Sequence, residues 1–203
     1  SIKARSEPMA IGKHVLNLTS CPVPEATNTT SFGGVGDALH RLIQQLVPRS
    51  SLVELSLQNL NEQQFGPNKD YTTNRLVSGP LQLAPGTVLV CAESALKEGK
   101  LNEAGVRNLE SLKHVLEWQK LEYDFQFYKM PMEVDIPAIV TSSGRKSLLA
   151  SDTQLPLSNV ATIEKMCTVA EQLSGLAEIE AVREYLEKCR AMVCPSNLQL
   201  HYS

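Results

Sequence analysis

The segment TVLVCAES, from Thr87 to Ser94, places a carboxylate directly after a short apolar run, a pattern that could carry catalysis. In P-loop ATPases a similar run ends in Asp-Glu. The aspartate holds the water shell of the magnesium ion, and the glutamate orients the attacking water. Here the corresponding pair is Ala92-Glu93. Because the side chain of Ala92 cannot bind a metal, the pair favours a polar or structural contact for Glu93 over catalysis.

A phosphate-binding loop would have to accompany that carboxylate, with the pattern Gly-x-x-x-x-Gly-Lys-Ser/Thr between a strand and a helix. Three segments come near it. Gly12-Lys13 precedes the first expected strand instead of following it. FGGVGD (32–37) lies between a strand and a helix, but Asp37 stands where a cation is needed, and SSGRKS (142–147) lacks the first glycine. We therefore expect each segment to be a turn, a helix start or a solvated loop.

Other catalytic and metal-binding patterns are missing from the sequence. It contains no Gly-x-Ser-x-Gly elbow, and its five cysteines form no Cys-x-x-Cys pair. Cys91 falls inside the apolar run and is expected to be an inert core thiol. The four histidines are dispersed along the chain: His14, His40, His114 and His201. We accordingly predict no catalytic residue, no metal site and no cofactor.

The composition is typical of a globular domain and argues against a nucleic-acid-binding role. Of the 203 residues, 42% are hydrophobic and 20% are charged, and the net charge is −3. Proteins that grip a phosphate backbone normally carry a basic excess. The aromatic residues Tyr123, Phe125 and Phe127 could stack on bases. They are interleaved with Glu122 and Asp124, so a sheet surface that faces the core is the favoured interpretation.

The sequence also gives expectations about the cellular compartment and about whether the chain is part of a longer protein. No apolar run reaches membrane-spanning length, and we find no signal-peptide pattern. The odd and scattered cysteines indicate reduced thiols in a reducing compartment. Because the chain begins with Ser1 and not with Met, we expect it to be a piece of a longer protein.

Short apolar runs predict buried strands, and segments of helical periodicity separate them. The expected strands are 14–18, 51–57, 87–91 and 136–141. The expected helices run from Val35 to a stop at Pro48, from Val106 to Leu116 after a turn at 99–105, and as two helices within 162–193. LEYDFQFY (121–128) alternates in polarity, which predicts a half-exposed strand in a hairpin that returns through 131–135.

These elements predict an α/β fold with a mainly parallel sheet, flanking helices, a β-hairpin insertion and a C-terminal helical segment. We expect three parts along the chain. An irregular N-terminal segment occupies residues 1–12, the α/β domain occupies 13–158, and a lid-like helical segment occupies 159–203.

Two longer motifs add a family resemblance to this pattern. KDYTTNRLVSGPLQL (69–83) and LEYDF (121–125), followed by DIPAIVTSSGRKSLL (135–149), resemble the C-terminal part of the mini-chromosome maintenance complex-binding protein family. The resemblance covers roughly residues 10–157. It implies an AAA-type ATPase fold that lacks a phosphate loop, a degenerate form that can be called a pseudo-ATPase. In such a fold TVLVC would be the third sheet strand, and Ser142 or Ser143 would lie near a polar sensor position.

The same resemblance implies a function. It is that of a non-enzymatic protein in the nucleus that associates with the mini-chromosome maintenance helicase. There it would regulate assembly of the helicase or its release from chromatin during DNA replication, and so support sister-chromatid cohesion. The alternative is an active NTPase with an unorthodox site made of Glu93, Gly33, Gly34 and a lysine from elsewhere. A nucleic-acid-binding module is a third possibility, which the negative charge disfavours.

Exposed polar loops are the segments that we expect to contact the helicase subunits. These are the loop 69–75, the turn 97–102 and the loop at 145–146. The predicted partner-binding residues are Lys69, Asp70, Tyr71, Asn74, Arg75, Lys97, Arg145 and Lys146. We expect association with chromatin to be indirect, and we expect neither sequence-specific nucleic-acid binding nor a membrane partner.

Overall fold

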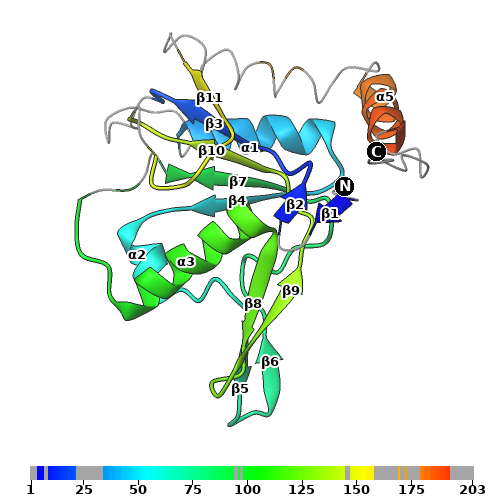
Figure 1. Ribbon diagram of the computed structural model, residues 1–203. Coiled ribbons are helices and arrows are strands. Elements are labelled where there is room, and N and C mark those ends of the chain that lie inside the picture. The colour runs from blue at the N-terminus through cyan, green and yellow to red at the C-terminus, as the bar shows by residue number, and fades with distance from the viewer. Residues whose placement is uncertain are drawn as a thin grey trace, which may run out of the picture.

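The computed structural model describes residues 4–6, 9–21, 34–93, 96, 98–144, 147–157, 169, 172 and 179–192. Its centre is a five-stranded sheet in the order β11-β3-β10-β7-β4, in which every neighbouring pair is parallel (Figure 1). The strands are β3 (Val15–Thr19), β4 (Ser50–Glu54), β7 (Val88–Ala92), β10 (Ala138–Thr141) and β11 (Thr153–Pro156). The predicted α/β class with a mainly parallel sheet is confirmed.

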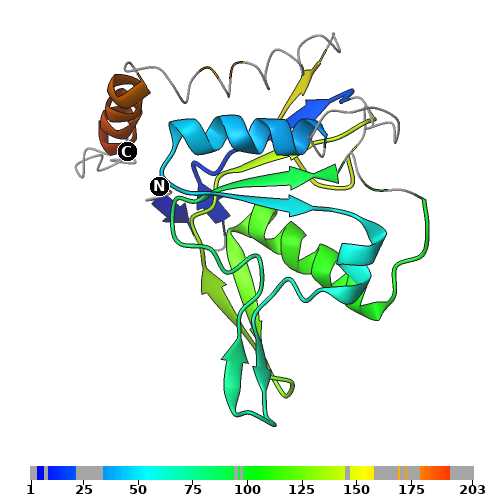
Figure 2. The same ribbon diagram turned by 180° about the vertical axis from the view of Figure 1, so that it is seen from behind.

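Helices cover both faces of this sheet, as the two opposite views show (Figures 1 and 2). The helix α1 (Val35–Leu46) lies on one face, and α2 (Leu57–Glu62) and α3 (Glu103–Trp118) lie on the other. A further helix, α5 (Ile179–Met192), lies beside α1. Strands with both faces covered need apolar residues throughout, which explains the unbroken apolar run of β7.

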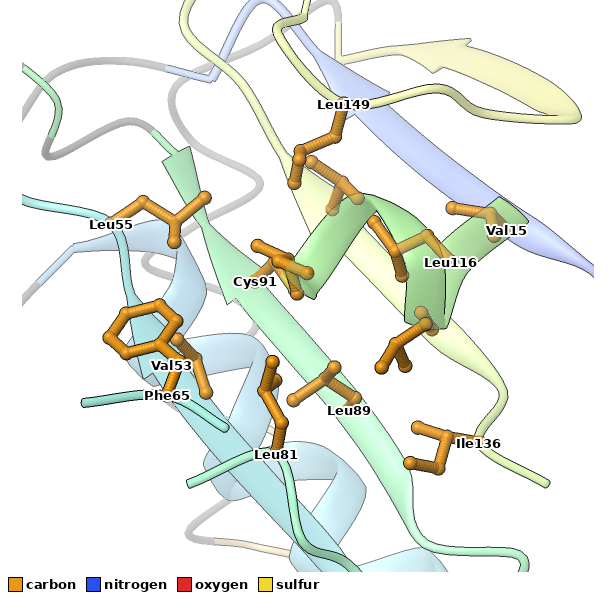
Figure 3. Close-up of a cluster of buried hydrophobic side chains, with 14 of the residues drawn as sticks. Val15, Val53, Leu55, Phe65, Leu81, Leu89, Cys91, Leu116, Ile136 and Leu149 are labelled. Atoms are coloured by element: carbon orange, nitrogen blue, oxygen red, sulfur yellow. The ribbon is translucent and has the colours of Figure 1, made fainter. Parts of the chain in front are cut away.

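The core consists of two layers, one on each face of the sheet. The larger layer packs side chains of α3 such as Leu112 and Leu116 against alternate strand residues such as Leu89 and Cys91 (Figure 3). The smaller layer packs Val35, Leu39 and Ile43 of α1 against the intervening strand residues. The spacing of four residues in α1 places these side chains on one stripe of the helix.

A second sheet projects from the parallel one and forms what we call the arm, residues 68–77 and 120–133 (Figure 1). Its strand order is β6-β5-β8-β9, with β5 (Asn68–Asp70), β6 (Arg75–Val77), β8 (Lys120–Asp124) and β9 (Lys129–Glu133). The pairs β5–β6 and β8–β9 are antiparallel, and one parallel pair of residues, Asn68 and Asp124, joins β5 to β8.

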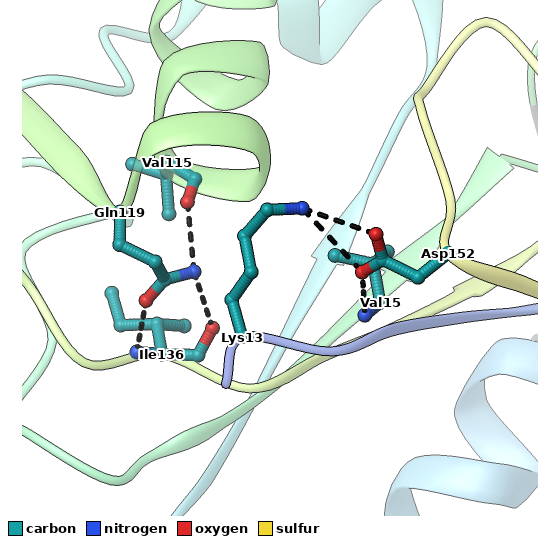
Figure 4. Close-up of polar contacts among 6 residues, drawn as sticks. All are labelled: Lys13, Val15, Val115, Gln119, Ile136 and Asp152. Carbon is teal, nitrogen blue, oxygen red and sulfur yellow. Dashed lines mark hydrogen bonds and ion pairs between the residues drawn. The ribbon is translucent and has the colours of Figure 1, made fainter. Parts of the chain in front are cut away.

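Gln119 fixes the point at which α3 ends and the arm begins. It adopts a left-handed backbone with φ of 52° and is buried. Its side-chain amide donates to the carbonyl of Val115 at 2.9 Å and to that of Ile136 at 3.0 Å, and its carbonyl accepts from the Ile136 N–H at 2.7 Å (Figure 4). One buried side chain thus ties the end of α3 to the segment that leads into β10.

Several sequence-based boundaries are corrected by the structure. The strand expected at 51–57 ends at Glu54, because Ser56 caps a short helix by accepting from the Asn59 N–H at 3.0 Å. The helix α3 begins at Glu103, inside the turn expected at 99–105, because the Asn102 side chain accepts from the Gly105 N–H at 2.7 Å. Such caps satisfy backbone N–H groups that the first helical turn leaves free.

The remaining differences concern short strands. The strand expected over 121–128 ends at Asp124, and two further short strands, β5 and β6, lie between α2 and β7, where the sequence predicted none. The segment expected to be irregular at 1–12 contains the antiparallel pair β1 (Ala4–Ser6) and β2 (Met9–Ile11). Most of the first of the two expected C-terminal helices lies outside the described residues. Among the residues that the structure describes, no helix is long and apolar enough to span a bilayer.

Candidate functional site

The carboxyl ends of the parallel strands form the first candidate region, which we call the carboxyl edge. Open parallel sheets usually bind ligands there, at the point where the strand order changes. Because β10 lies between β3 and β7, Ser142 separates the end of β3 from Glu93, which follows β7. This edge is where a phosphate loop and catalytic carboxylates would have to converge.

Both carboxylate oxygens of Glu93 are engaged by a loop of the chain itself. The hydroxyl of Ser147 donates to one oxygen, and the N–H of Leu148 donates to the other at 2.9 Å. The N–H of Leu149 in turn donates to the Ser147 hydroxyl at 3.0 Å. Glu93 is almost completely buried. The carboxylate therefore holds the loop that follows β10, which is the structural contact favoured for it above.

The first turn of α1 packs directly on the end of β7. A Cβ atom built on Gly36 would lie only 2.6 Å from the Cβ of Ala92 and 3.4 Å from the hydroxyl of Thr141. Real Cβ atoms do not approach carbon that closely, so the helix and the strand touch through glycine and alanine. The space in which an ATPase would place its metal-binding aspartate is filled by the helix backbone.

Ser142, directly after β10, ties this central strand to its neighbour β3 at the carboxyl edge. Its N–H donates to the carbonyl of Leu18 at 2.9 Å, and its carbonyl accepts from the Cys21 N–H at 2.9 Å. Its hydroxyl donates to the side-chain oxygen of buried Asn17 at 3.1 Å. The amide nitrogen of Asn17 and the hydroxyl of Thr141 are buried and have no hydrogen-bond partner among the described residues.

The thiols near the carboxyl edge are protected from ionisation. Burial raises the pKa of the Cys91 thiol to about 12, and the negative charge of Glu93 adds to the rise. Burial also raises the pKa of Cys21 to about 11, although a backbone hydrogen bond from Ser142 partly opposes it. Because the thiolate is the reactive form, both residues are core thiols at neutral pH.

Of the three segments that came near a phosphate loop, SSGRKS reaches Glu93 through the hydroxyl of Ser147, and neither Lys13 nor Asp37 pairs with this carboxylate. Lys13 precedes β3, at the other end of that strand, and pairs with Asp152 at 3.2 Å (Figure 4). Asp37 pairs with Arg41 at 3.1 Å within α1. Gly33, Arg145 and Lys146 lie outside the described residues. Within the described part of the chain, no three His, Cys, Asp or Glu side chains are grouped as metal ligands would be.

The arm is the second candidate region, and five of the predicted partner-binding residues lie on its β5–β6 hairpin. Lys69 donates to the carbonyl of Asn74 at 2.9 Å, across the turn. Asn74 has a left-handed backbone with φ of 52°, and Arg75 is exposed at the start of β6. Tyr71 donates its hydroxyl to the carbonyl of Phe125 at 2.9 Å, which links this hairpin to the other one.

Asp70 organises the turn of this hairpin. Its carboxylate accepts from the Thr72 N–H at 2.9 Å, from the Thr72 hydroxyl, and from the Thr73 hydroxyl at 2.7 Å. These hydrogen bonds stabilise the charged form of Asp70 and lower its pKa to about 2. The hydrogen bonds from the hydroxyls of Thr72 and Thr73 make the largest contributions to this shift. The predicted residues Lys97, Arg145 and Lys146 fall outside the described residues.

The aromatic residues of 121–128 only partly face the core, which corrects the interpretation made from the sequence. Leu121 is buried, and Tyr123 and Phe125 are half-buried, but Phe127 is 85% exposed. The alternation breaks because β8 ends at Asp124 and the chain turns through Gln126, whose φ is 62°. At the tip the rings of Tyr71 and Phe127 meet edge to face, with centroids 5.9 Å apart.

Three apolar residues of the arm were missed as candidate binding residues: Tyr128, Met130 and Met132. All three are exposed, and they alternate along the chain, with Met130 and Met132 in β9 and Tyr128 directly before it. The alternation YKMPM is visible in the sequence and would have been the signal, but Pro131 in its centre weakens the strand pattern.

Comparison with known proteins adds the family to this geometry. Residues 1–200 match the family described as mini-chromosome maintenance replisome factor. The chain belongs to this family. The mini-chromosome maintenance complex-binding protein of Salmo salar is 37% identical over 195 residues, which cover 95% of this chain and 30% of that protein. The protein of the same name in Arabidopsis thaliana is 36% identical over 191 residues, which cover 94% of this chain and 30% of that protein.

A third replisome-factor relative, from Homo sapiens, is 40% identical over 157 residues, which cover 77% of this chain and 23% of that protein. This chain therefore spans less than a third of the length of the relatives it matches. Their shared name states that those proteins bind the mini-chromosome maintenance complex.

Proposed function

We propose that this chain is a non-enzymatic binding module for the mini-chromosome maintenance helicase complex. Family membership over residues 1–200 supports the proposal, as do relatives named for binding that complex. Because the chain spans 30% or less of those relatives, the proposal concerns the contribution of this part alone.

The packing of Gly36 on Ala92 carries the non-enzymatic half of the proposal. A magnesium ion demands octahedral oxygen ligands at about 2.0–2.1 Å and usually keeps several waters. With a hypothetical Gly36 Cβ only 2.6 Å from that of Ala92, a carboxylate and a hydrated ion do not fit between α1 and β7. Glu93, whose two oxygens hold residues 147 and 148, is not free to orient water.

The order of the strands supports a degenerate AAA-type module, as the sequence resemblance implies. With β10 between β3 and β7, Ser142 stands between the loop after β3 and Glu93, where a polar sensor residue would act. A module shaped like a helicase subunit can bury the surfaces that a neighbouring subunit would bury. This gives a physical route to binding without catalysis.

The finer role that we propose is control of helicase assembly or of its release from chromatin during DNA replication, in the nucleus. Sister-chromatid cohesion would depend on that control. The description of the family as a replisome factor supports a role in replication.

The direct test mixes the purified chain with the assembled helicase complex and with its separate subunits on a sizing column. We expect co-elution with the complex or with at least one subunit. A chain that elutes alone in every mixture would remove the binding proposal for this part of the protein.

The alternative of an active NTPase is tested by thermal unfolding with millimolar ATP and magnesium. A ligand at 100 times its dissociation constant adds about 2.7 kcal/mol to the free energy of unfolding, which would raise the melting temperature clearly. We expect no shift. A shift together with ATP hydrolysis that Glu93→Gln abolishes would establish the alternative.

A further inference from the structure

The arm holds an unusual share of the exposed apolar side chains. Fifteen large apolar residues are exposed in the described part of the chain, and seven of them lie on the arm: Tyr71, Leu76, Val77, Phe127, Tyr128, Met130 and Met132. Exposed aromatic and methionine side chains gathered in one place mark interaction surfaces, because leaving them in water is unfavourable.

Strand register gives the β8–β9 hairpin one apolar face and one charged face. Three cross-strand pairs share the apolar face: Phe125 with Tyr128, Tyr123 with Met130, and Leu121 with Met132. On the other face Asp124 lies opposite Lys129 and Lys120 lies opposite Glu133. Partners across an antiparallel pair point to the same side, so the two faces do not mix.

The β9 half of the apolar face is open to solvent. Met130 and Met132 are each 45% exposed and Tyr128 is 55% exposed, whereas Leu121 on β8 is buried. We call Tyr128, Met130 and Met132 the apolar stripe. The ring of Phe125 stacks on Tyr128 at 4.9 Å, so one end of the apolar stripe is already ordered before any partner binds.

The charges of the arm exclude a nucleic-acid partner. The arm carries four acidic and four basic residues: Asp70, Glu122, Asp124 and Glu133 against Lys69, Arg75, Lys120 and Lys129. A phosphate backbone requires a clear excess of basic charge. The apolar stripe contains no charged residue, so it complements an uncharged protein surface.

Pro131 excludes strand addition as the mode of binding. The N–H of Phe125 bonds to the carbonyl of Tyr128 and the N–H of Val134 bonds to the carbonyl of Gln119, so Pro131 lies at a position that faces away from β8. A proline there offers no N–H to an added strand. The partner must instead pack across the apolar face.

We infer that the apolar stripe, together with Phe127 at the tip, is the surface through which this chain contacts a subunit of the mini-chromosome maintenance complex. The inference rests on the proposed function for the identity of the partner. The partner surface is apolar and uncharged at its centre, and it lies across the face of β9.

The test measures the affinity of the chain for the helicase complex with variants on the two faces of the arm. Met132→Glu and Tyr128→Glu change the apolar stripe. Val77→Glu is the matched control, because Val77 is 47% exposed on the arm, and its register with Asn68 and Asp124 places it on the charged face. We expect the first two to weaken binding by about tenfold or more, the effect of losing a central interface contact. Val77→Glu should stay within about twofold.

Phe127→Ala keeps the test valid if the charged variants unfold. Phe127 is 85% exposed, so its truncation leaves the fold intact. We expect it to weaken binding several-fold with an unchanged melting temperature. Equal binding by wild type, Phe127→Ala and Met132→Glu would overturn the inference and leave the proposed function standing. Salt-sensitive retention of single-stranded DNA by the arm would also overturn it, and a wild-type chain that binds no subunit would remove the inference and the proposed function together.

Discussion

The carboxyl edge and the arm differ in whether their side chains are satisfied by contacts within the chain. At the carboxyl edge, most of the polar groups are directed at one another: Glu93 holds the loop at 147–148, and Ser142 joins β3 to β10. On the arm, charged residues pair on one face while Tyr128, Met130 and Met132 are left in water. At the edge where an α/β fold usually holds a small ligand, Glu93 is bound by the chain itself, whereas the region that projects from the sheet leaves apolar side chains exposed.

The largest expected effect on stability compares a buried and an exposed residue of the alternating segment 121–128. Leu121→Ala should lower the free energy of unfolding by about 2–5 kcal/mol, because it empties a fully buried site. Phe127→Ala, six residues later, should change it by less than about 0.5 kcal/mol. Urea denaturation monitored by circular dichroism measures both. Similar losses for the two variants would show that Phe127 belongs to the core, and the arm would lose its exposed tip.

The next effect tests the close contact at the carboxyl edge. Gly36→Ala should lower the free energy of unfolding by about 1–3 kcal/mol, because the added methyl group meets Ala92 at 2.6 Å. Helix propensity acts in the opposite direction, because a helix favours alanine over glycine by about 1 kcal/mol. The sign of the measured change in the free energy of unfolding therefore shows whether the steric clash or the helix propensity is larger. In a protein that already carries Ala92→Gly, Gly36→Ala should lower the free energy of unfolding by about 1 kcal/mol less than it does in wild type. This difference is the size of the interaction energy expected for two residues in contact. A Gly36→Ala protein as stable as wild type would mean that the edge is open.

A smaller effect concerns the carboxylate at that edge. Glu93→Gln should lower the free energy of unfolding by about 1 kcal/mol, because a charge-assisted acceptor of two hydrogen bonds becomes a neutral amide. The matched control is Glu54→Gln, which changes an exposed carboxylate at the end of neighbouring β4 and should have almost no effect. Equal stability of both variants would contradict the structural role of Glu93.

The smallest effect belongs to the turn of the arm. The pKa of Asp70 is lowered to about 2 from its usual 3.8, so its contribution to the order of the turn is present above pH 4 and is lost as the pH falls through 2. Carboxyl chemical shifts in an NMR titration report this directly. Replacing both Thr72 and Thr73 with valine should return the pKa toward 3.8. An Asp70 that titrates normally in the wild-type chain would show that the turn is not held by these hydrogen bonds.

The strands of the parallel sheet could be predicted from the sequence, whereas several short elements could not, and the reason is physical. The runs that become β7 and β10 were predictable because strands covered on both faces must be apolar throughout. The α2 cap at Ser56 and the hairpin turn at Asp70 depend on the hydrogen bonds of one side chain each, which hydrophobic periodicity does not reveal. Their short elements were therefore missed.

The candidate sites show the same limit. Position 92 carries an alanine, which cannot bind a metal through its side chain, and this is visible in one residue of the sequence. The partner of Glu93 is Ser147, 54 residues away, and no local pattern links the two. Likewise, the exposure of Met130 and Met132 depends on the face that β9 presents in the assembled arm, which no local pattern encodes.

The contact between Gly36 and Ala92 also constrains how this chain could change in the future. Placing an aspartate at position 92 would drive a carboxylate against the backbone of α1, and the variant would lose stability. A metal-binding aspartate at position 92 would therefore also need α1 to lie farther from β7. Two small residues, Gly36 and Ala92, make the two changes dependent on each other.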